Sequence, residues 1–186
     1  MQWVVHPHPS LATGDQYMMR EGCDHSPQEC GGPVSVEANK QLVTRWYEAL
    51  AAGDFEAIFD MHHDDVVYNM VGNTPVSGRL YGKDACCNGM IAEKLLQQLV
   101  PGQFRFAKHW SIVAAEGDRV VGLMQGGGPT RNGGDYDQTY CEIFTIRDGK
   151  ITEMHNFFDT VLVEDCLFGN PLTRPESPVA DPFQVG

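Results

Sequence analysis

The stretch RWYEALAAGDFEAIFDMHHDDVVYNMVGNTPVSGRLYGKDA, residues 45–85 of this 186-residue chain, decides the fold. Its apolar residues first recur with helical spacing, and a Gly-Asp pair at 53–54 then separates a second, shorter helix. The run VVYNMV is typical of a strand, and the turn GNTPVSG leads into a third helix. We therefore predict an α+β fold, in which three N-terminal helices and a cone-shaped, curved, antiparallel-rich sheet enclose one pocket.

Capping and turn residues set the expected boundaries of these elements. Ser35 is expected to cap a helix that ends near residue 52, and Asp54 to cap a second helix that ends at Asp64-Asp65. The third helix is expected over residues 83–99. Four longer strands follow, with hairpin turns at 116–118 and 147–150 and with the glycine run 126–128 as a wide loop at the edge of the cone. Asp159 is expected to cap a short last helix.

The domain organisation follows from composition. Residues 1–33 are rich in Pro, Gly, His and Met and are predicted to be an N-terminal extension, residues 34–168 to be the cone domain, and residues 169–186 to be a C-terminal tail. The extension contains three residues that could bind a metal, Cys23, His25 and Cys30. They are a weak candidate for a zinc site, because such a site needs four well-spaced ligands. We predict no metal site and no organic cofactor.

The charge and the hydropathy pattern exclude several functions. The net charge is −12 and no basic cluster offsets it, which argues against a nucleic-acid partner. No apolar run is long enough to cross a membrane, and the first residues do not resemble a signal peptide. The six cysteines form no CxxC pair. A cytoplasmic protein with reduced thiols is therefore expected.

The quoted stretch, together with the hairpin CEIFTIRDGKITEMHNFFD, resembles the nuclear-transport-factor-2-like superfamily over residues 36–168. Within it the chain is similar to SnoaL-like polyketide cyclases, ketosteroid isomerases and limonene-epoxide hydrolases. The resemblance implies a homodimer that forms through the outer face of the sheet. It implies the fold more strongly than the reaction, because this fold carries enzymes, carriers and scaffolds.

The resemblance also implies where reactive groups would fall. The base of the ketosteroid isomerases falls at Asn69, and their oxyanion-hole tyrosine and acid fall at Trp46 and Gln138. The Asp-Arg-Asp set of the epoxide hydrolases falls on uncharged residues, although their water-holding asparagine matches Asn69. Those uncharged residues are Gln125, Leu123 and Asn156. The aspartate of the cyclases has its nearest candidate at Asp159, which is also a helix cap.

Strand alternation predicts which side chains face the pocket. The polar candidates are His62, Asn69, Gln125, Gln138, Tyr140, Glu142 and Asn156. The apolar candidates are Trp46, Val67, Met90, Leu123, Met154 and Phe158. Buried amides and acids are costly without partners, so this set favours a ligand pocket over a closed polar network.

His62 and Glu142 are the candidates for proton transfer, with Glu142 orienting the imidazole and with Tyr140 and Asn69 binding the polar group. The alternative for His62 is a helix-end histidine that binds backbone carbonyls, and the alternative for Glu142 is an ion pair with Arg105.

Two functions remain open from the sequence. The first is a cofactor-independent acid–base enzyme, an isomerase, cyclase, dehydratase (a lyase) or epoxide hydrolase, acting on a small, largely apolar oxygenated molecule such as a terpenoid or polyketide. The second is a non-catalytic protein of the same fold that binds or carries such a molecule.

Overall fold

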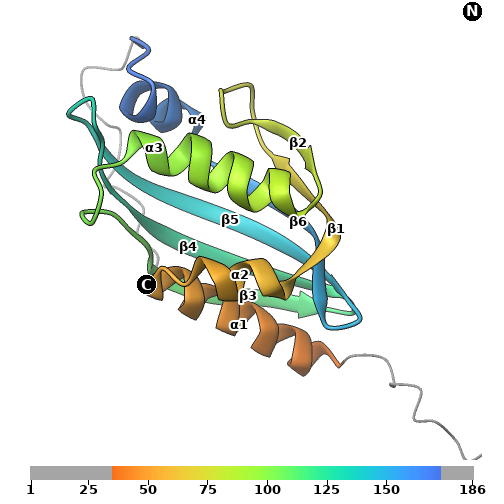
Figure 1. Cartoon of the computed structure of the whole chain (residues 1–186). Helices are drawn as coiled ribbons and strands as arrows, with labels where there is room; N and C mark the ends of the chain where they lie inside the picture. Colours follow the sequence, from red (N-terminus) through yellow and green to blue (C-terminus); the bar gives the residue numbers. More distant parts are fainter. Residues whose placement is uncertain (1–34, 173–186) are drawn as a thin grey trace, which may run out of the picture. The chain divides into compact units, whose positions relative to one another are not determined.

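A computed structural model describes residues 35–172 of the chain. The predicted N-terminal extension and most of the predicted C-terminal tail lie outside these residues, as do Cys23, His25 and Cys30. The described part is an α+β unit built on one curved, open, six-stranded sheet, as the sequence predicts (Figure 1).

The first two helices begin at the predicted caps. Helix α1 spans Val36–Ala52, and Ser35 accepts a hydrogen bond from the Ala38 amide at 3.1 Å. Helix α2 spans Phe55–Met61, and Asp54 accepts one from the Ala57 amide at 3.0 Å. These side chains satisfy amides that have no partner within the helix, which explains why each helix begins there.

Helix α2 ends earlier than predicted. Strand β1 runs His62–Met70, so His62 is the first residue of the strand and not part of the helix. The prediction that the helix extends to Asp64-Asp65 is wrong, because His62 already has extended backbone geometry and pairs with Ile151. Strand β2, Gly78–Tyr81, then follows the predicted turn and pairs with β1.

The third helical segment covers the predicted range with unexpected geometry. It consists of the π-helix η1, Asp84–Leu95, and the short helix α3, Leu96–Gln98. A π-helix has wider turns than an α-helix and is often found at functional sites. Figure 1 shows this segment lying over the same face of the sheet as α1 and α2.

Four long strands complete the sheet: β3 (Arg105–Glu116), β4 (Arg119–Pro129), β5 (Asp135–Arg147) and β6 (Lys150–Phe158). The strand order is β2-β1-β6-β5-β4-β3, and all neighbours are antiparallel except β1 and β6. The last turns are α4 (Thr160–Leu162) and η2 (Val163–Leu167). The predicted cap is confirmed, since Asp159 accepts a bond from the Val161 amide at 2.8 Å.

The glycine run 126–128 was predicted as a loop, and this prediction is wrong. These glycines are buried within β4. A Cβ on Gly126 would lie 2.7 Å from the carbonyl oxygen of Arg105 on the neighbouring strand. The missing side chains therefore allow β3 to pass close to β4, which a loop reading of the same residues does not reveal.

The core lies between the helices and the concave face of the sheet. Trp46 and Tyr47 of α1 pack edge-to-face on Phe144 of β5, and Tyr47 stacks on Trp110 of β3 with ring centroids 5.1 Å apart. These aromatic contacts hold α1 across the strands that carry the candidate site.

Candidate functional site

A small pocket of about 60 Å³ opens on the concave face of the sheet. Most of its lining side chains are apolar, and one carboxyl group and one amide group also line it. Its lining residues come from α1, β1, η1 and β3–β6: Trp46, Leu50, Tyr68, Met70, Met90, Ile91, Leu95, Phe106, Met124, Tyr140, Glu142, Met154 and Asn156. Such a wall with a few convergent polar groups is typical of small-molecule sites.

Glu142 is the carboxyl group of this pocket, and it is buried. Its Oε2 accepts a hydrogen bond from the Tyr47 hydroxyl at 2.8 Å. Burial raises the pKa of Glu142 to about 7, and the bond from Tyr47 opposes that rise. The carboxyl therefore changes its protonation state near neutral pH, which is the property that a general acid or base needs.

Two buried hydrogen-bond donors stand in the same wall without a partner among the described residues. They are the indole Nε1 of Trp46 and the amide Nδ2 of Asn156. Asn156 is paired directly with Glu142 in the ladder between β5 and β6. A buried donor without an acceptor costs free energy, so both donors favour a ligand that carries an oxygen acceptor.

His62 lies behind the pocket and contacts it through Tyr68. Its Nδ1 is 2.6 Å from the Ile58 carbonyl oxygen, and its Nε2 is 2.7 Å from the Tyr68 hydroxyl. Burial lowers the pKa of His62 to about 4, and the bond to Ile58 opposes that shift. The histidine is thus a neutral side chain bonded to the end of α2, as the alternative interpretation of the sequence states.

Six of the predicted site residues line the pocket: Glu142, Tyr140, Trp46, Met90, Met154 and Asn156. Tyr140 shares a 2.9 Å hydrogen bond with the Tyr136 hydroxyl. The predicted pairing of Glu142 with His62 is replaced by separate bonds, to Tyr47 for the carboxyl and to Ile58 and Tyr68 for the imidazole.

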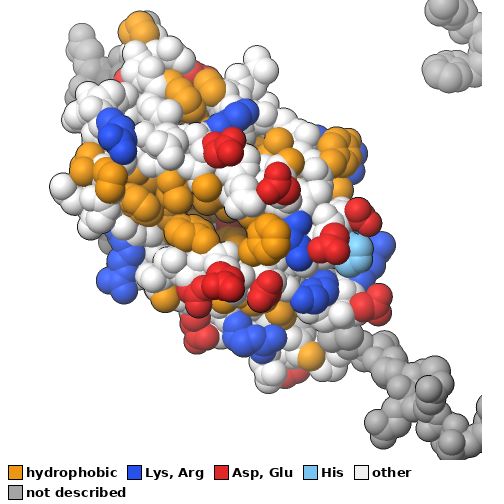
Figure 2. All heavy atoms as spheres, viewed as in Figure 1, with side chains coloured by type: hydrophobic (Ala, Val, Ile, Leu, Met, Phe, Trp, Pro, Cys, Tyr) orange, Lys and Arg blue, Asp and Glu red, His pale blue; other side chains and the backbone are white. Residues whose placement is uncertain are grey.

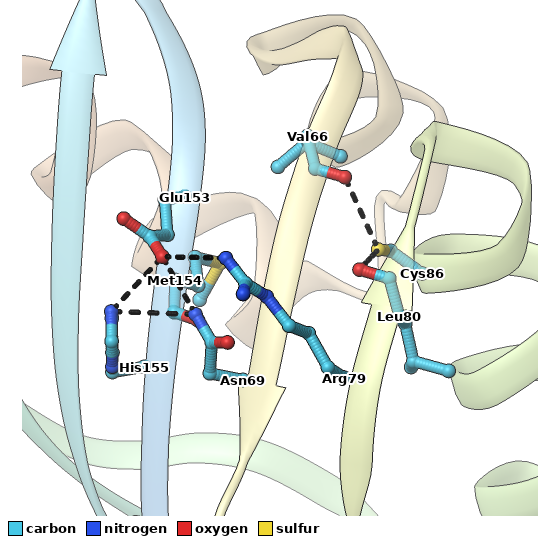
Figure 3. A network of polar contacts seen from close by, with 8 residues as sticks. All are labelled: Val66, Asn69, Arg79, Leu80, Cys86, Glu153, Met154 and His155. Carbon is cyan, nitrogen blue, oxygen red and sulfur yellow. Dashed lines mark hydrogen bonds and ion pairs between the residues drawn. The ribbon is translucent and has the colours of Figure 1, made fainter. Parts of the chain in front are cut away.

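The predicted orientation of β1 is wrong by one residue. Tyr68 and Met70 line the pocket, whereas Val67 is half-buried outside its lining. Asn69 lies in a polar cluster on the outer face, where its amide donates to Glu153 at 2.8 Å beside His155 and Arg79 (Figure 3). Both faces of β1 carry apolar residues, so hydrophobicity alone did not distinguish them.

The predicted orientation of β4 is wrong for a different reason. Met124 lines the pocket and pairs with Tyr140, while Leu123 pairs with Cys141 and Gln125 with Thr139 on the outer face. The concave positions of β4 include Gly122 and Gly126, which carry no side chain. With glycine at two concave positions, the sequence of β4 has no apolar alternation that distinguishes its two faces.

Gln138 and Phe158 lie beside the pocket rather than in its lining. The Gln138 side chain is buried and bonds to both the amide and the carbonyl of Asp159, at 3.0 and 2.8 Å. It therefore fixes the start of α4. The Phe158 ring is tilted against Tyr140, with centroids 6.0 Å apart.

Sequence reasoning missed Tyr47 and Tyr68 as functional residues. Tyr47 lies among the buried apolar residues of α1, so the helical pattern accounts for it without its hydroxyl. A glycine inside a strand, Gly122, marks the close approach of another group, and in the structure a Cβ there would lie 2.1 Å from the Tyr47 hydroxyl. Tyr68 was missed because its strand was oriented incorrectly.

A larger groove of about 380 Å³ lies between α2 and η1. Figure 2 shows hydrophobic side chains gathered around a hollow on this face. Ile91 lines both the groove and the pocket, which places the two cavities side by side. The groove is mainly apolar and is lined by Phe55, Glu56, Ile58, Phe59, Cys87, Asn88, Ile91, Ala92 and Leu96.

Comparisons with known proteins agree with this architecture. A family model described as a SnoaL-like domain matches residues 43–154. No curated protein matches the chain. Among solved structures, an NTF2-like protein from Burkholderia xenovorans LB400 is 21% identical, with a TM-score of 0.53 over 72% of this chain and 98% of the other.

Two further structures share the fold. TerC, crystallised with polyporic acid, is 24% identical, with a TM-score of 0.57 over 70% of this chain and 98% of its own. An LEH-like epoxide hydrolase from M. tuberculosis is 22% identical, with a TM-score of 0.51 over 71% of this chain and 90% of its own. Identities this low support the fold and leave the reaction open.

Neither a helix that could span a membrane nor a cluster of metal ligands is found within residues 35–172. None of the helices in this range combines the length and the apolar character needed to span a bilayer. In the same range, His, Cys, Asp and Glu side chains do not gather in groups of three or more that would hold a metal ion. The homodimer, the cytoplasmic location and the N-terminal extension stay predictions.

Proposed function

Because the chain belongs to the SnoaL-like domain family, we propose that it is a cofactor-independent acid–base enzyme that acts on a small, largely apolar, oxygenated molecule. A terpenoid or a polyketide ketone, alcohol or epoxide has the required chemistry. The reaction would be an isomerisation, a cyclisation, a dehydration or an epoxide opening, in which Glu142 transfers a proton.

One observation carries this proposal: two unpartnered donors stand beside a carboxyl group that titrates near neutral pH. Trp46 and Asn156 can donate to the oxygen of a substrate, while Glu142 gives a proton to it or takes one from it. Hydrogen-bond donors fixed in a dry site stabilise charge that develops on such an oxygen. The three groups together thus support acid–base chemistry at an oxygenated carbon.

The cavities support the amphipathic character of the substrate. Ligand pockets for drug-sized molecules usually measure roughly 300–1,000 Å³. The pocket alone, about 60 Å³, is smaller than this range, and the groove, about 380 Å³, falls within it. We propose that the oxygenated end of the substrate occupies the pocket and that its apolar body extends past Ile91 into the groove.

A carrier function is the second candidate. The pocket wall is mostly apolar, and the Tyr47 bond already occupies one oxygen of Glu142. A protein with these features would hold an apolar ligand without changing it.

Incubation with a mixture of apolar terpenoid and polyketide ketones, alcohols and epoxides tests both candidates. Mass spectrometry of the mixture detects new masses or isomers if the protein is an enzyme, and native mass spectrometry detects an unchanged bound compound if it is a carrier. An unchanged mixture with no bound compound would contradict both functions.

Replacing Asn156 by leucine is expected to stabilise the fold while it impairs the site. Leucine has a similar size and removes an unpartnered buried amide, so the free energy of unfolding should rise by about 1–2 kcal/mol. Binding of a compound found in the incubation should weaken about tenfold or more. Chemical denaturation and calorimetric titration measure the two effects. A less stable variant with unchanged affinity would contradict the role of Asn156.

A further inference from the structure

The bonds around His62 define which of its nitrogens carries a proton. A backbone carbonyl can only accept, so Nδ1, 2.6 Å from the Ile58 oxygen, carries the hydrogen. The buried imidazole is neutral, and its Nε2 therefore has a free lone pair. The Tyr68 hydroxyl, 2.7 Å away, must donate to that nitrogen. Its proton thus points away from the pocket, toward His62.

Because its proton is directed to His62, the Tyr68 hydroxyl can contact any further polar partner only as an acceptor. Tyr68 lines the pocket, and its oxygen accepts a hydrogen bond from the Cys87 thiol, because the single proton of the hydroxyl is directed to His62. Burial raises the pKa of both groups, so both stay protonated. The second lone pair of the Tyr68 oxygen is the acceptor that we assign to a hydroxyl or a water in the pocket, while Tyr68 donates to His62.

Tyr68 and Glu142 stand on opposite sides of β6. Tyr68 on β1 pairs with Met154, and Glu142 on β5 pairs with Asn156. Neighbouring strands are roughly 4.8 Å apart and Met154 and Asn156 are two positions apart along β6, so the two backbones are about 12 Å apart. One small molecule can contact both side chains. Burial raises the pKa of Glu142 and lowers that of His62, which lies behind Tyr68, and such opposite shifts are typical of an acid and a base.

We propose that Tyr68 is a second catalytic residue, which takes a proton from a substrate hydroxyl or from water and passes its own proton to His62. The inference rests on the proposed function, in which Glu142 is then the proton donor. It narrows the reaction to the addition of an O–H group to a carbon.

The proposed step conserves atoms and charge. The oxygen of the hydroxyl or water forms a bond to carbon as its O–H bond breaks. That proton goes to the Tyr68 oxygen, and the Tyr68 proton goes to Nε2 of His62. The electron pair displaced from carbon moves to an oxygen of the substrate, which takes the proton of Glu142. His62 ends as an imidazolium and Glu142 as a carboxylate, and proton exchange with solvent restores both.

Two probes test the step with the full chain. One is an apolar epoxide in ¹⁸O-labelled water, and the other is an apolar hydroxy-enone that can close to a cyclic ether. Tyr68→Phe and His62→Gln are each expected to lower kcat about 10²-fold or more, with a small change in KM. The double variant should lose no more kcat than either single variant, because each single substitution already breaks the same relay. Tyr81→Phe, which removes an exposed tyrosine hydroxyl on β2 outside the pocket lining, is the control.

The outcomes separate the inference from the proposed function. If Glu142→Gln loses turnover while Tyr68→Phe keeps the wild-type kcat, the relay through Tyr68 is wrong. The proposed acid–base function is then unaffected. Losses that multiply in the double variant also overturn the relay. If the wild type converts neither probe, the proposed O–H addition is wrong. The proposed function is then still tested by the incubation experiment. ¹⁵N NMR of His62 gives an independent readout: a proton on Nε2 instead of Nδ1 would contradict the geometry.

Discussion

Replacing Glu142 by glutamine is expected to lower turnover about 10³-fold, in the middle of the range for the loss of a general acid or base. Glutamine keeps the shape of the side chain and can still accept the bond from Tyr47, but it cannot transfer a proton. Glu153→Gln on the outer face of β6 is the matched control and should keep wild-type turnover. Full activity in Glu142→Gln would contradict the proposed role.

The pH dependence of the wild type tests the same residue. Since Glu142 is proposed to act in its protonated form, turnover should fall as the pH rises through about 7, the pKa of the folded protein. A rate that rises through this pH would instead indicate a base, and a rate that does not change there would contradict both roles.

Glu142 should also affect stability, with a defined sign. The unfolded chain releases this proton near the ordinary pKa of 4.5, and the folded protein keeps it until about 7. The contribution of Glu142 to the free energy of unfolding is therefore fully present below 4.5 and is lost as the pH rises to 7. The difference between the two pKa values corresponds to about 3 kcal/mol. Above pH 7, Glu142→Gln should be more stable than the wild type in urea denaturation.

Replacing Gly122 by valine is the second large effect that we expect. A Cβ at this position would lie 2.1 Å from the Tyr47 hydroxyl and 2.8 Å from two ring carbons. Tyr47 is fully buried and stacked on Trp110, so it has little space to move. We expect a loss of about 3 kcal/mol in the free energy of unfolding, at the upper end for overpacking.

The same substitution should change the site. A displaced Tyr47 no longer donates to Glu142, so the pKa of that carboxyl should rise above about 7. Carbon-13 NMR of the carboxyl measures this shift. Tyr47→Leu should partly rescue the stability of Gly122→Val. Gly89→Ala is the control, because its nearest neighbouring atom is 3.9 Å away. Unchanged stability of Gly122→Val would contradict the packing argument.

The sequence was sufficient for the fold because its signals are local. Ser35, Asp54 and Asp159 each cap a helix whose first turn they precede, and the hairpin turns define the long strands. The inward faces of β5 and β6 were also predictable, since large buried residues alternate there with half-buried or exposed ones. Short-range patterns therefore determined most of the architecture.

The site was harder to predict because it depends on contacts between distant residues. The bond between Tyr47 and Glu142 joins positions 95 residues apart in the chain. The orientation of β4 depends on Gly122, whose role becomes clear only when Tyr47 is placed above it. The link between His62 and Tyr68 depends on the end of α2, which no capping residue marks.

The wide turns of η1 have a consequence for how the substrate range of this protein can change. Met90 and Ile91 reach the cavities from a segment that holds more residues per turn than an ordinary helix. Deleting one residue upstream of them would rotate both side chains about the helix axis, by somewhat less than the roughly 100° per residue of an α-helix. A single-codon deletion could thus exchange the residues that contact a ligand and leave Glu142 and Asn156 untouched. This offers evolution and protein engineering a route to new ligands that preserves the reactive groups.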